Sequence, residues 1–299
     1  MDRYTVLNEL AATRTGQVLL CADRQTGATV VVKRVQVQFV NVGGPGAVDP
    51  SASIELQVHR KLCENGGHRH ILQLLNDFSA DGSEYFVLEH CRNGELFDHV
   101  ENAPDRRLDP SLVQTYFGHI CSAVQFMHAQ GFAHCDLSLE NVLVDAHGNL
   151  KLSDFGLATA LHTCRQNLVG KPFYMAPEMH LMDAYDPAKA DVWSLGVMLF
   201  ILLTGSPPFE VAHESDASMQ FIATKGCRGL CHAWKLENVI PPAAIDLLEK
   251  MLVINPVERW SLGQVAAHAY VVESTSAKTC GDVATASSRK SSLVSEILH

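Results

Sequence analysis

The first ninety residues alternate between short runs rich in β-branched residues and clusters of turn residues. Three runs near the start predict strands separated by turn signals such as Gln25-Thr26-Gly27; they are Tyr4–Leu10, Gln17–Ala22 and Thr29–Val37. Two further runs predict strands on either side of a turn at Asp81-Gly82; they are Ile71–Phe78 and Tyr85–His90. The pattern therefore predicts a small β-rich unit at the beginning of the chain.

One helix is expected inside this β-rich unit. A Gly/Pro-rich stretch at residues 41–50 can continue neither a strand nor a helix, and Ser51 or Ser53 after it is a suitable N-cap. Apolar and acidic residues then follow at helical spacing through Glu55 to Leu62. Asn65-Gly66-Gly67 predicts the end of this helix.

After Asn93-Gly94 the pattern changes to helical periodicity. Pro110 fits the first turn of a long helix whose buried face recurs at i, i+3 and i+4, namely Leu112, Val113, Tyr116, Phe117, Ile120, Val124 and Met127. More helices are predicted at Ala188–Leu203, Ala243–Leu252 and Leu262–His268. The expected fold class is α+β with two lobes: an antiparallel sheet with one main helix at about residues 4–90, and a larger helical lobe at about 94–270. A ligand is expected in the cleft between them.

The last part of the chain, residues 271–299, is rich in Ser and Thr and predicts a flexible tail. Its serines near Arg289-Lys290 are either autophosphorylation sites or part of a passive tail.

Composition narrows the functional class. Among 299 residues, 47% are hydrophobic and 19% charged, which is typical of a globular protein. The net charge of −10 argues against a nucleic-acid partner. The longest apolar run, Val197–Leu203, is too short to cross a membrane, and the start lacks a signal-peptide pattern. Nine scattered cysteines favour a reducing compartment, so we expect a cytoplasmic or nuclear protein. The sequence does not indicate an oligomeric state.

Phosphoryl-transfer chemistry is suggested by five charged or polar residues. The reaction needs charge neutralisation and alignment of the attacking hydroxyl rather than covalent help. Lys33 on a strand can contact phosphates, with Glu55 on the following helix as its partner. Asp136 can accept the hydroxyl proton, and Asn141 and Asp154 are hard oxygen ligands for Mg²⁺.

These residues belong to an ordered set of motifs, which are Val30-Val31-Val32-Lys33, Glu55, His134/Asp136/Asn141, Asp154-Phe155-Gly156, Ala176-Pro177-Glu178, residues 191–196 and Arg259. In this order they resemble a eukaryotic protein kinase of the serine/threonine type over roughly Tyr4–Tyr270. Residues 94–97 and 205–209 are most similar to calcium/calmodulin-type or cyclic-nucleotide-type kinases. The resemblance implies ATP and Mg²⁺ as cofactors and protein substrates as partners.

The resemblance also implies a nucleotide pocket and structural pairs. Leu10, Val18, Val31 and Leu143 correspond to residues that enclose adenine, Leu88 to the gatekeeper, and the backbones of Glu89 and Cys91 to the hinge. Glu95 corresponds to an acid that contacts ribose or a basic substrate residue, although a helix N-terminal acid explains it equally well. Glu178 and Arg259 correspond to a structural ion pair, and Asp191 to the residue that braces the catalytic loop.

The phosphate-covering loop and three single positions depart from the family pattern. Of the glycines in the phosphate-covering loop only Gly16 is present, so we expect weaker ATP binding. Arg14 in the same loop is expected to compensate in part as a mobile cation. Cys135 replaces the Arg that usually receives an activation-loop phosphate, so we expect activity that does not require phosphorylation at Thr159 or Thr163.

Ser138 and Lys171 stand where a Lys and a Thr are usual. If the two face each other, Lys171 can act as a catalytic cation; otherwise it points outward.

Two functions follow from these observations. The first is an active Ser/Thr kinase, because Lys33, Glu55, Asp136, Asn141 and Asp154 are all present. The alternative is a pseudokinase that binds nucleotide or acts as a scaffold, because fold alone does not prove activity. The acidic charge, with Glu95 and Glu140, favours substrates with basic residues upstream of the phosphosite.

Overall fold

The N-terminal lobe is a five-stranded antiparallel sheet. The computed structural model describes residues 1–13, 16–36, 50–166, 169–181 and 183–276. The strands follow the order β1-β2-β3-β5-β4 and comprise β1 (Tyr4–Thr13), β2 (Gly16–Asp23), β3 (Thr29–Gln36), β4 (Leu74–Ala80) and β5 (Ser83–Glu89). All five predicted strands are present. β4 begins three residues later than predicted, because Ile71 instead forms a parallel bridge to Leu152.

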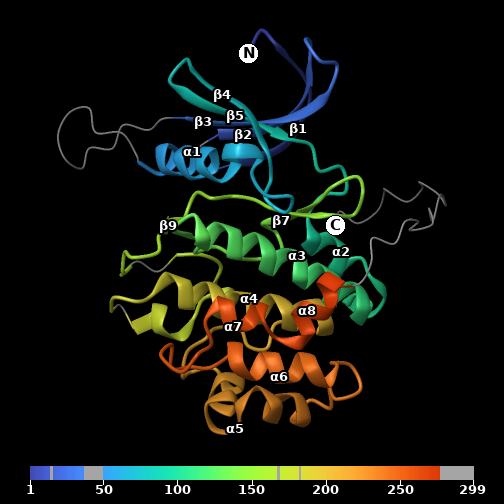
Figure 1. The fold of residues 1–299 in the computed structure, drawn as a ribbon, viewed down its shortest axis with the longest axis vertical. Coiled ribbons are helices and arrows are strands. Elements are labelled where there is room, and N and C mark those ends of the chain that lie inside the picture. The colour runs from blue at the N-terminus through green and yellow to red at the C-terminus, as the bar shows by residue number, and fades with distance from the viewer. Residues whose placement is uncertain (14–15, 37–49, 167–168, 182, 277–299) are drawn as a thin grey trace, which may run out of the picture.

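One helix, α1 (Pro50–Cys63), packs beneath this sheet (Figure 1). It begins at Pro50, so Ser51 and Ser53 lie inside the helix and the prediction that one of them is the N-cap is wrong. Proline is favourable at the first helical position because its missing N–H would have no partner there. The predicted end is confirmed: Asn65, Gly66 and Gly67 all have positive φ angles.

The C-terminal lobe is helical (Figure 1). Its helices are α2 (Leu96–Glu101), α3 (Pro110–Ala129), α4 (Pro187–Thr204), α5 (Ala217–Ala233), α6 (Pro242–Met251), α7 (Leu262–Ala266) and α8 (Ala269–Ser276). Short 3₁₀ segments include η3 (Pro172–Tyr174) and η4 (Pro177–Leu181). Two small antiparallel pairs complete it, β6 (Phe132–Ala133) with β9 (Thr159–Ala160) and β7 (Val142–Val144) with β8 (Leu150–Leu152). The predicted two-lobed α+β architecture is confirmed.

Helix α3 has the predicted buried face, with one exception. Asp109 caps it by accepting hydrogen bonds from the backbone N–H groups of Ser111 and Leu112, and Pro110 occupies the first turn. All the predicted core positions are buried except Leu112, which is 39% exposed. Leu112 lies in the first turn of α3, before the apolar face of the helix packs against the core.

Helix α4 contains the longest apolar run, Val197–Leu203. Its 18 residues meet the length and hydropathy of a membrane span, although 83% of them are buried inside the protein. α4 contacts α3, α6 and α7, which cover its surface. It is therefore the core helix of the C-terminal lobe.

The end of the described chain extends the domain past the predicted boundary. Helix α8 continues to Ser276, so the first residues of the predicted tail are helical. Buried Tyr270 and Val271 attach this helix to the main core. The remaining predicted tail, residues 277–299 with its serines, lies outside the described residues.

Candidate active site

The loop between β6 and β7 carries the predicted catalytic residues, and Asp191 on α4 holds its backbone. The Asp191 carboxylate accepts hydrogen bonds from the backbone N–H of His134 at 2.8 Å and of Cys135 at 2.9 Å. His128 Nε2 lies 2.8 Å from the same carboxylate, a contact that the sequence did not indicate. Asp191 is 1% exposed, so this brace is shielded from water.

Asp136 and Asn141 are in direct contact. The Asn141 amide donates to the backbone carbonyl of Asp136 at 2.7 Å and to Asp136 Oδ2 at 2.9 Å. The five-residue spacing in the sequence therefore closes a small loop that fixes the carboxylate. Burial raises the pKa of Asp136, while the Lys171 ammonium and the Asn141 hydrogen bond act in the opposite direction.

Lys33 joins the two lobes through a pair of carboxylates. Its Nζ lies 2.6 Å from Glu55 Oε1 on α1 and 3.3 Å from Asp154 Oδ1 on the segment after β8. Burial alone would lower the pKa of Lys33, but the charges of Glu55 and Asp154 outweigh it and raise this pKa. The pKa of Asp154 is lowered because Lys33 and His134 outweigh its own desolvation. Lys33 is therefore a fixed cation flanked by two acids.

Three aromatic rings in edge-on contact connect α1 with the catalytic loop. The Phe155 ring is 0% exposed and packs edge-on against His59 of α1, with ring centroids 4.9 Å apart, and against His134, with centroids 5.6 Å apart. His59 Nε2 lies 2.7 Å from the Leu72 carbonyl oxygen, and burial lowers the pKa of His59 to about 4. A neutral His59 thus packs as an internal ring, and Phe155 is held between the lobes next to Asp154.

Most of the predicted nucleotide-binding residues lie together. Leu88 and Cys91 are buried in one apolar cluster, and Val31 and Leu143 pack against it. Val31 pairs with Leu88 across β3 and β5. This cluster is the apolar surface that the sequence predicts for a purine.

The remaining nucleotide-pocket predictions are placed by their strands. Val18 pairs with Lys33 in the β2–β3 ladder. Leu10 is 48% exposed and sits at an irregularity of the β1–β2 register, outside the apolar cluster. Glu89 begins the connection to the C-terminal lobe, where its carboxylate binds the Gln73 backbone N–H and Lys151.

Gly16 has a packing role that the sequence did not reveal. A Cβ built there would lie 1.7 Å from the Arg34 carbonyl oxygen of β3. Any side chain would therefore separate the strands next to Lys33. Arg14, which was expected to supply a mobile cation, lies outside the described residues.

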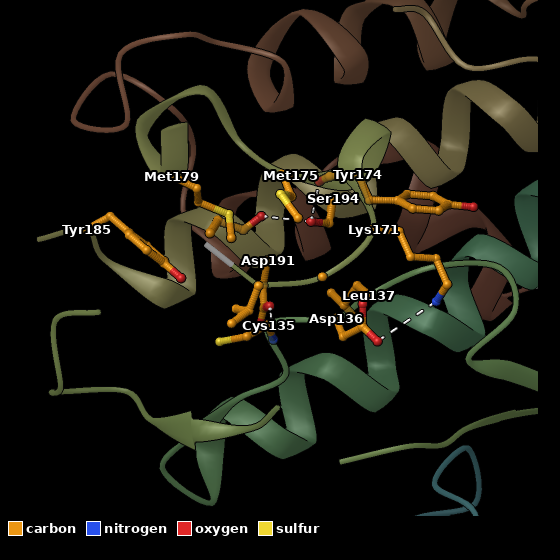
Figure 2. Close-up of a pocket in the computed structure, with 13 residues that line it drawn as sticks. Cys135, Asp136, Leu137, Lys171, Tyr174, Met175, Met179, Tyr185, Asp191 and Ser194 are labelled. Carbon is orange, nitrogen blue, oxygen red and sulfur yellow. Dashed lines mark hydrogen bonds and ion pairs between the residues drawn. The ribbon is translucent and has the colours of Figure 1, made fainter. Parts of the chain in front are cut away.

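Lys171 faces the catalytic loop, which is the first of the two alternatives that the sequence left open. Its Nζ donates to Ser138 Oγ at 2.8 Å. The same Nζ lies 3.8 Å from Asp136 Oδ2 (Figure 2). The hydroxyl and the ammonium at these two positions therefore face each other. The interpretation that Lys171 points outward is wrong.

Acidic side chains surround Glu95 at the start of α2. Burial first, then the charges of Asp98 and Glu140, raise the pKa of Glu95. Glu140 is held by the Tyr174 hydroxyl, which donates to its Oε2 at 3.2 Å. Tyr174 also accepts from the Leu139 N–H, and thus ties the segment before α4 to the catalytic loop.

Cys135 occupies a buried position beside Asp191. Its φ angle is +64°, in the left-handed region, and the Asp191 hydrogen bond fixes this turn. Burial, and then the charge of Asp191, raise the pKa of its thiol to about 12, which disfavours a reactive thiolate. Together with Asp136, Lys171, Tyr185 and other residues it lines a small cavity under the loop (Figure 2).

Arg165 is a site residue that no sequence signal identified. Its guanidinium donates to the Leu157 carbonyl oxygen at 2.5 Å. It also lies close enough to the Cys135 thiol to lower the pKa of that thiol against the effect of burial. Its backbone pairs with Tyr185 in both directions, at 3.2 and 2.9 Å. A cation of the segment after β9 thus sits at the catalytic loop.

A buried ion pair stabilises the C-terminal lobe. Arg259 donates two parallel hydrogen bonds to Glu178, at 2.6 and 2.8 Å, and its guanidinium lies 5.0 Å from the centroid of the Trp193 ring. The structure confirms this predicted contact.

Comparison with known proteins identifies the family. The sequence model described as "Protein kinase domain" matches residues 4–271. The chain is 34% identical to the serine/threonine-protein kinase chk1 of Schizosaccharomyces pombe, over 96% of this chain and 58% of the relative. It is 33% identical to CBL-interacting serine/threonine-protein kinase 12 of Arabidopsis thaliana, over 90% and 53% respectively. It is 32% identical to the maternal embryonic leucine zipper kinase of Danio rerio, over 91% and 38%.

The chain spans between about two fifths and three fifths of the length of these curated relatives. The family match, by contrast, covers nearly all of the lobes described above, including every contact of Lys33, Asp136 and Asp154. The chain therefore belongs to the protein kinase family.

Proposed function

We propose that this chain is an active protein serine/threonine kinase that transfers the γ-phosphoryl group of ATP to hydroxyl groups of protein substrates. The observation that carries the proposal is the position of Lys33, 2.6 Å from Glu55 and 3.3 Å from Asp154. These contacts bring α1, β3 and the segment after β8 together at one point. Catalysis in protein kinases depends on such contacts of the strand lysine.

The residues divide the reaction between them. Asp136, held by Asn141, accepts the proton of the substrate hydroxyl. The hydroxyl oxygen forms a bond to the γ-phosphorus while the bond from that phosphorus to the bridging oxygen breaks, and ADP leaves with the electron pair. Lys33 binds and orients the phosphates, and Glu55 holds Lys33 in place. The apolar cluster around Leu88 receives the adenine.

The donor set fits Mg²⁺. Asn141 donates hydrogen bonds to Asp136 through Nδ2, and its Oδ1 is the side-chain atom that can bind a cation. The Asp154 side chain is 49% exposed. Two hard oxygen donors suit Mg²⁺, which retains waters and phosphate oxygens as its other ligands. When bound, the ion neutralises negative charge on the phosphates. Asp154 and Asn141 would hold it.

Serine and threonine are the proposed acceptors, and basic residues upstream of them are proposed as the recognition element. The names of the two relatives chk1 and CBL-interacting kinase 12 support the first point. The acidic group of Glu95, Asp98 and Glu140 supports the second, because its mutual repulsion is relieved by a cationic peptide.

We further propose that activity does not require phosphorylation of Thr159 or Thr163. The Arg165 guanidinium lies near Cys135 of the catalytic loop and donates to the Leu157 carbonyl oxygen, and the Arg165 backbone pairs with Tyr185. These contacts support an anchored segment without an added phosphate. A Thr159→Ala/Thr163→Ala variant is expected to keep its kcat within about twofold. Arg165→Ala is expected to lower kcat, with exposed Arg92→Ala as the control. A phosphatase-sensitive activity in the unsubstituted chain would contradict this proposal.

The pseudokinase alternative rests on the phosphate-covering loop, where Gly16 is the one glycine of the pattern and serves strand packing. Calorimetric titration with ATP and Mg²⁺, combined with mass spectrometry of a basic serine peptide after incubation, separates the two functions. The kinase proposal expects nucleotide binding and a phosphopeptide, both reduced by Asp154→Ala. Nucleotide binding without a phosphopeptide would support the pseudokinase instead.

A further inference from the structure

The strongest unassigned feature of the site is the ammonium group of Lys171. It lies in the segment before η3 and reaches Ser138 on the catalytic loop at 2.8 Å and Asp136 at 3.8 Å. Within the described ranges, no other lysine or arginine forms an ion pair with Asp136. Lys171 is therefore the lysine or arginine of these ranges that pairs with Asp136, and it comes from outside the catalytic loop.

The backbone is shaped to allow this approach. Gly170 has a φ angle of +96°, and a Cβ there would lie 3.2 Å from the Cys135 carbonyl oxygen and 3.3 Å from Asp136 Oδ1. Only glycine combines this dihedral angle with such close packing. Gly170 therefore allows the segment that carries Lys171 to pack closely against Asp136.

Ser138 explains how the ammonium is held without being neutralised. Ser138 is fully buried and supplies an uncharged oxygen that accepts one of the three ammonium hydrogens. At 3.8 Å, Asp136 attracts the cation but leaves it room for a third, anionic partner. The Lys171 side chain is 33% exposed, so part of it remains accessible from solvent.

We propose that Lys171 is a catalytic residue that stabilises the negative charge on the phosphoryl group during its transfer to the substrate hydroxyl. This rests on the proposed kinase function. The transferred group spreads its charge over three equatorial oxygens, so a preorganised cation beside the base acts where that charge develops. Lys171 stays protonated throughout and exchanges no proton.

Three variants test the assignment with ATP, Mg²⁺ and a basic serine peptide. Lys171→Met keeps the side-chain length and removes the charge, and is expected to lower kcat by about 10- to 100-fold with little change in the KM for ATP. Ser138→Lys/Lys171→Ser exchanges the two residues, and is expected to recover most of the lost kcat. Exposed Lys225→Met on α5 is the matched control and is expected to behave like the unsubstituted chain.

Thermal unfolding separates catalysis from a structural role. A structural role predicts a lower melting temperature for Lys171→Met, whereas the proposal predicts a lower kcat at an unchanged melting temperature. A Lys171→Met kcat within twofold of the parent, or an exchanged variant no better than Lys171→Met at equal thermal stability, would overturn the proposal. An unsubstituted chain no more active than Asp154→Ala would instead refute the proposed function, and with it any catalytic role for Lys171.

Discussion

Asp191 accepts a hydrogen bond from the backbone N–H of Cys135 at 2.9 Å, at a residue whose φ angle is +64°. A non-glycine residue in the left-handed region costs on the order of 1–3 kcal/mol and persists only where surrounding contacts fix it. The buried carboxylate of the core helix α4 supplies that contact one residue before Asp136. The geometry of the base therefore depends on an acid from another part of the chain.

Replacing Asp191 with Asn should disturb this turn. Asn places an NH₂ group against backbone N–H donors, so we expect the free energy of unfolding to fall by about 2–3 kcal/mol and kcat to fall at least tenfold. Chemical denaturation and peptide phosphorylation measure the two effects. The control is Asp186→Asn at the N-cap of the same helix, where Asn caps as well as Asp. An equal, small effect of both substitutions would argue against the brace.

Gly16→Ala should weaken the N-terminal lobe through packing. The added Cβ would lie 1.7 Å from the Arg34 carbonyl oxygen, so β2 and β3 must separate beside Lys33. We expect a loss of about 1–3 kcal/mol in stability and a raised Kd for ATP. Gly263→Ala in α7 is the matched control, because its Cβ would meet only Ser261 Oγ, at an ordinary contact distance of 4.0 Å. Unchanged thermal stability and nucleotide affinity in Gly16→Ala would contradict the packing role.

Histidine burial predicts loss of stability in acid. Burial lowers the pKa of His59 from 6.5 to about 4, so the unfolded chain binds its proton more readily than the folded one. The contribution of neutral His59 to the free energy of unfolding is fully present above pH 6.5. As the pH falls from 6.5 towards 4, about 3 kcal/mol of stability is lost through this residue. His59→Leu should flatten the decline.

Denaturant unfolding at pH 7, 6, 5 and 4.5 measures this effect. Some decline should remain in His59→Leu, because burial also lowers the pKa of His70 and His119. Exposed His162→Gln is the control and should follow the unsubstituted chain. Parallel curves for His59→Leu and the unsubstituted chain would show that His59 is not responsible.

The local features of the fold could be predicted from the sequence, because they depend on short-range patterns. Alternating β-branched runs identified the five strands, and the i, i+3, i+4 pattern identified α3 and α4. Helix α5 was missed because Gly226 and Gly229 interrupt its periodicity, and Gly226 breaks the helical dihedral angles at φ +70°. The short α2 and α8 offer too few turns for a periodic pattern.

The site was only partly predictable for a related reason. Ordered motifs identified Lys33, Asp136 and Asp154, and the exchange of residue types between 138 and 171 indicated a contact that the structure confirms. Arg165 lies near Cys135, 30 residues earlier in the chain, and His128 contacts Asp191, 63 residues later. Both contacts depend on side-chain directions that only the folded chain defines. The packing role of Gly16 likewise depends on how closely β3 approaches.

Phosphoryl transfer from ATP to a basic serine peptide is the measurement that tests the central claim most directly. The assay uses metal-depleted buffer with Mg²⁺ added back, and compares the unsubstituted chain with Asp136→Asn and Asp154→Ala. The account predicts Mg²⁺-dependent formation of phosphoserine by the unsubstituted chain, and a loss of at least about 100-fold in both variants. Transfer equal in all three proteins, or absent from the unsubstituted chain, would contradict it.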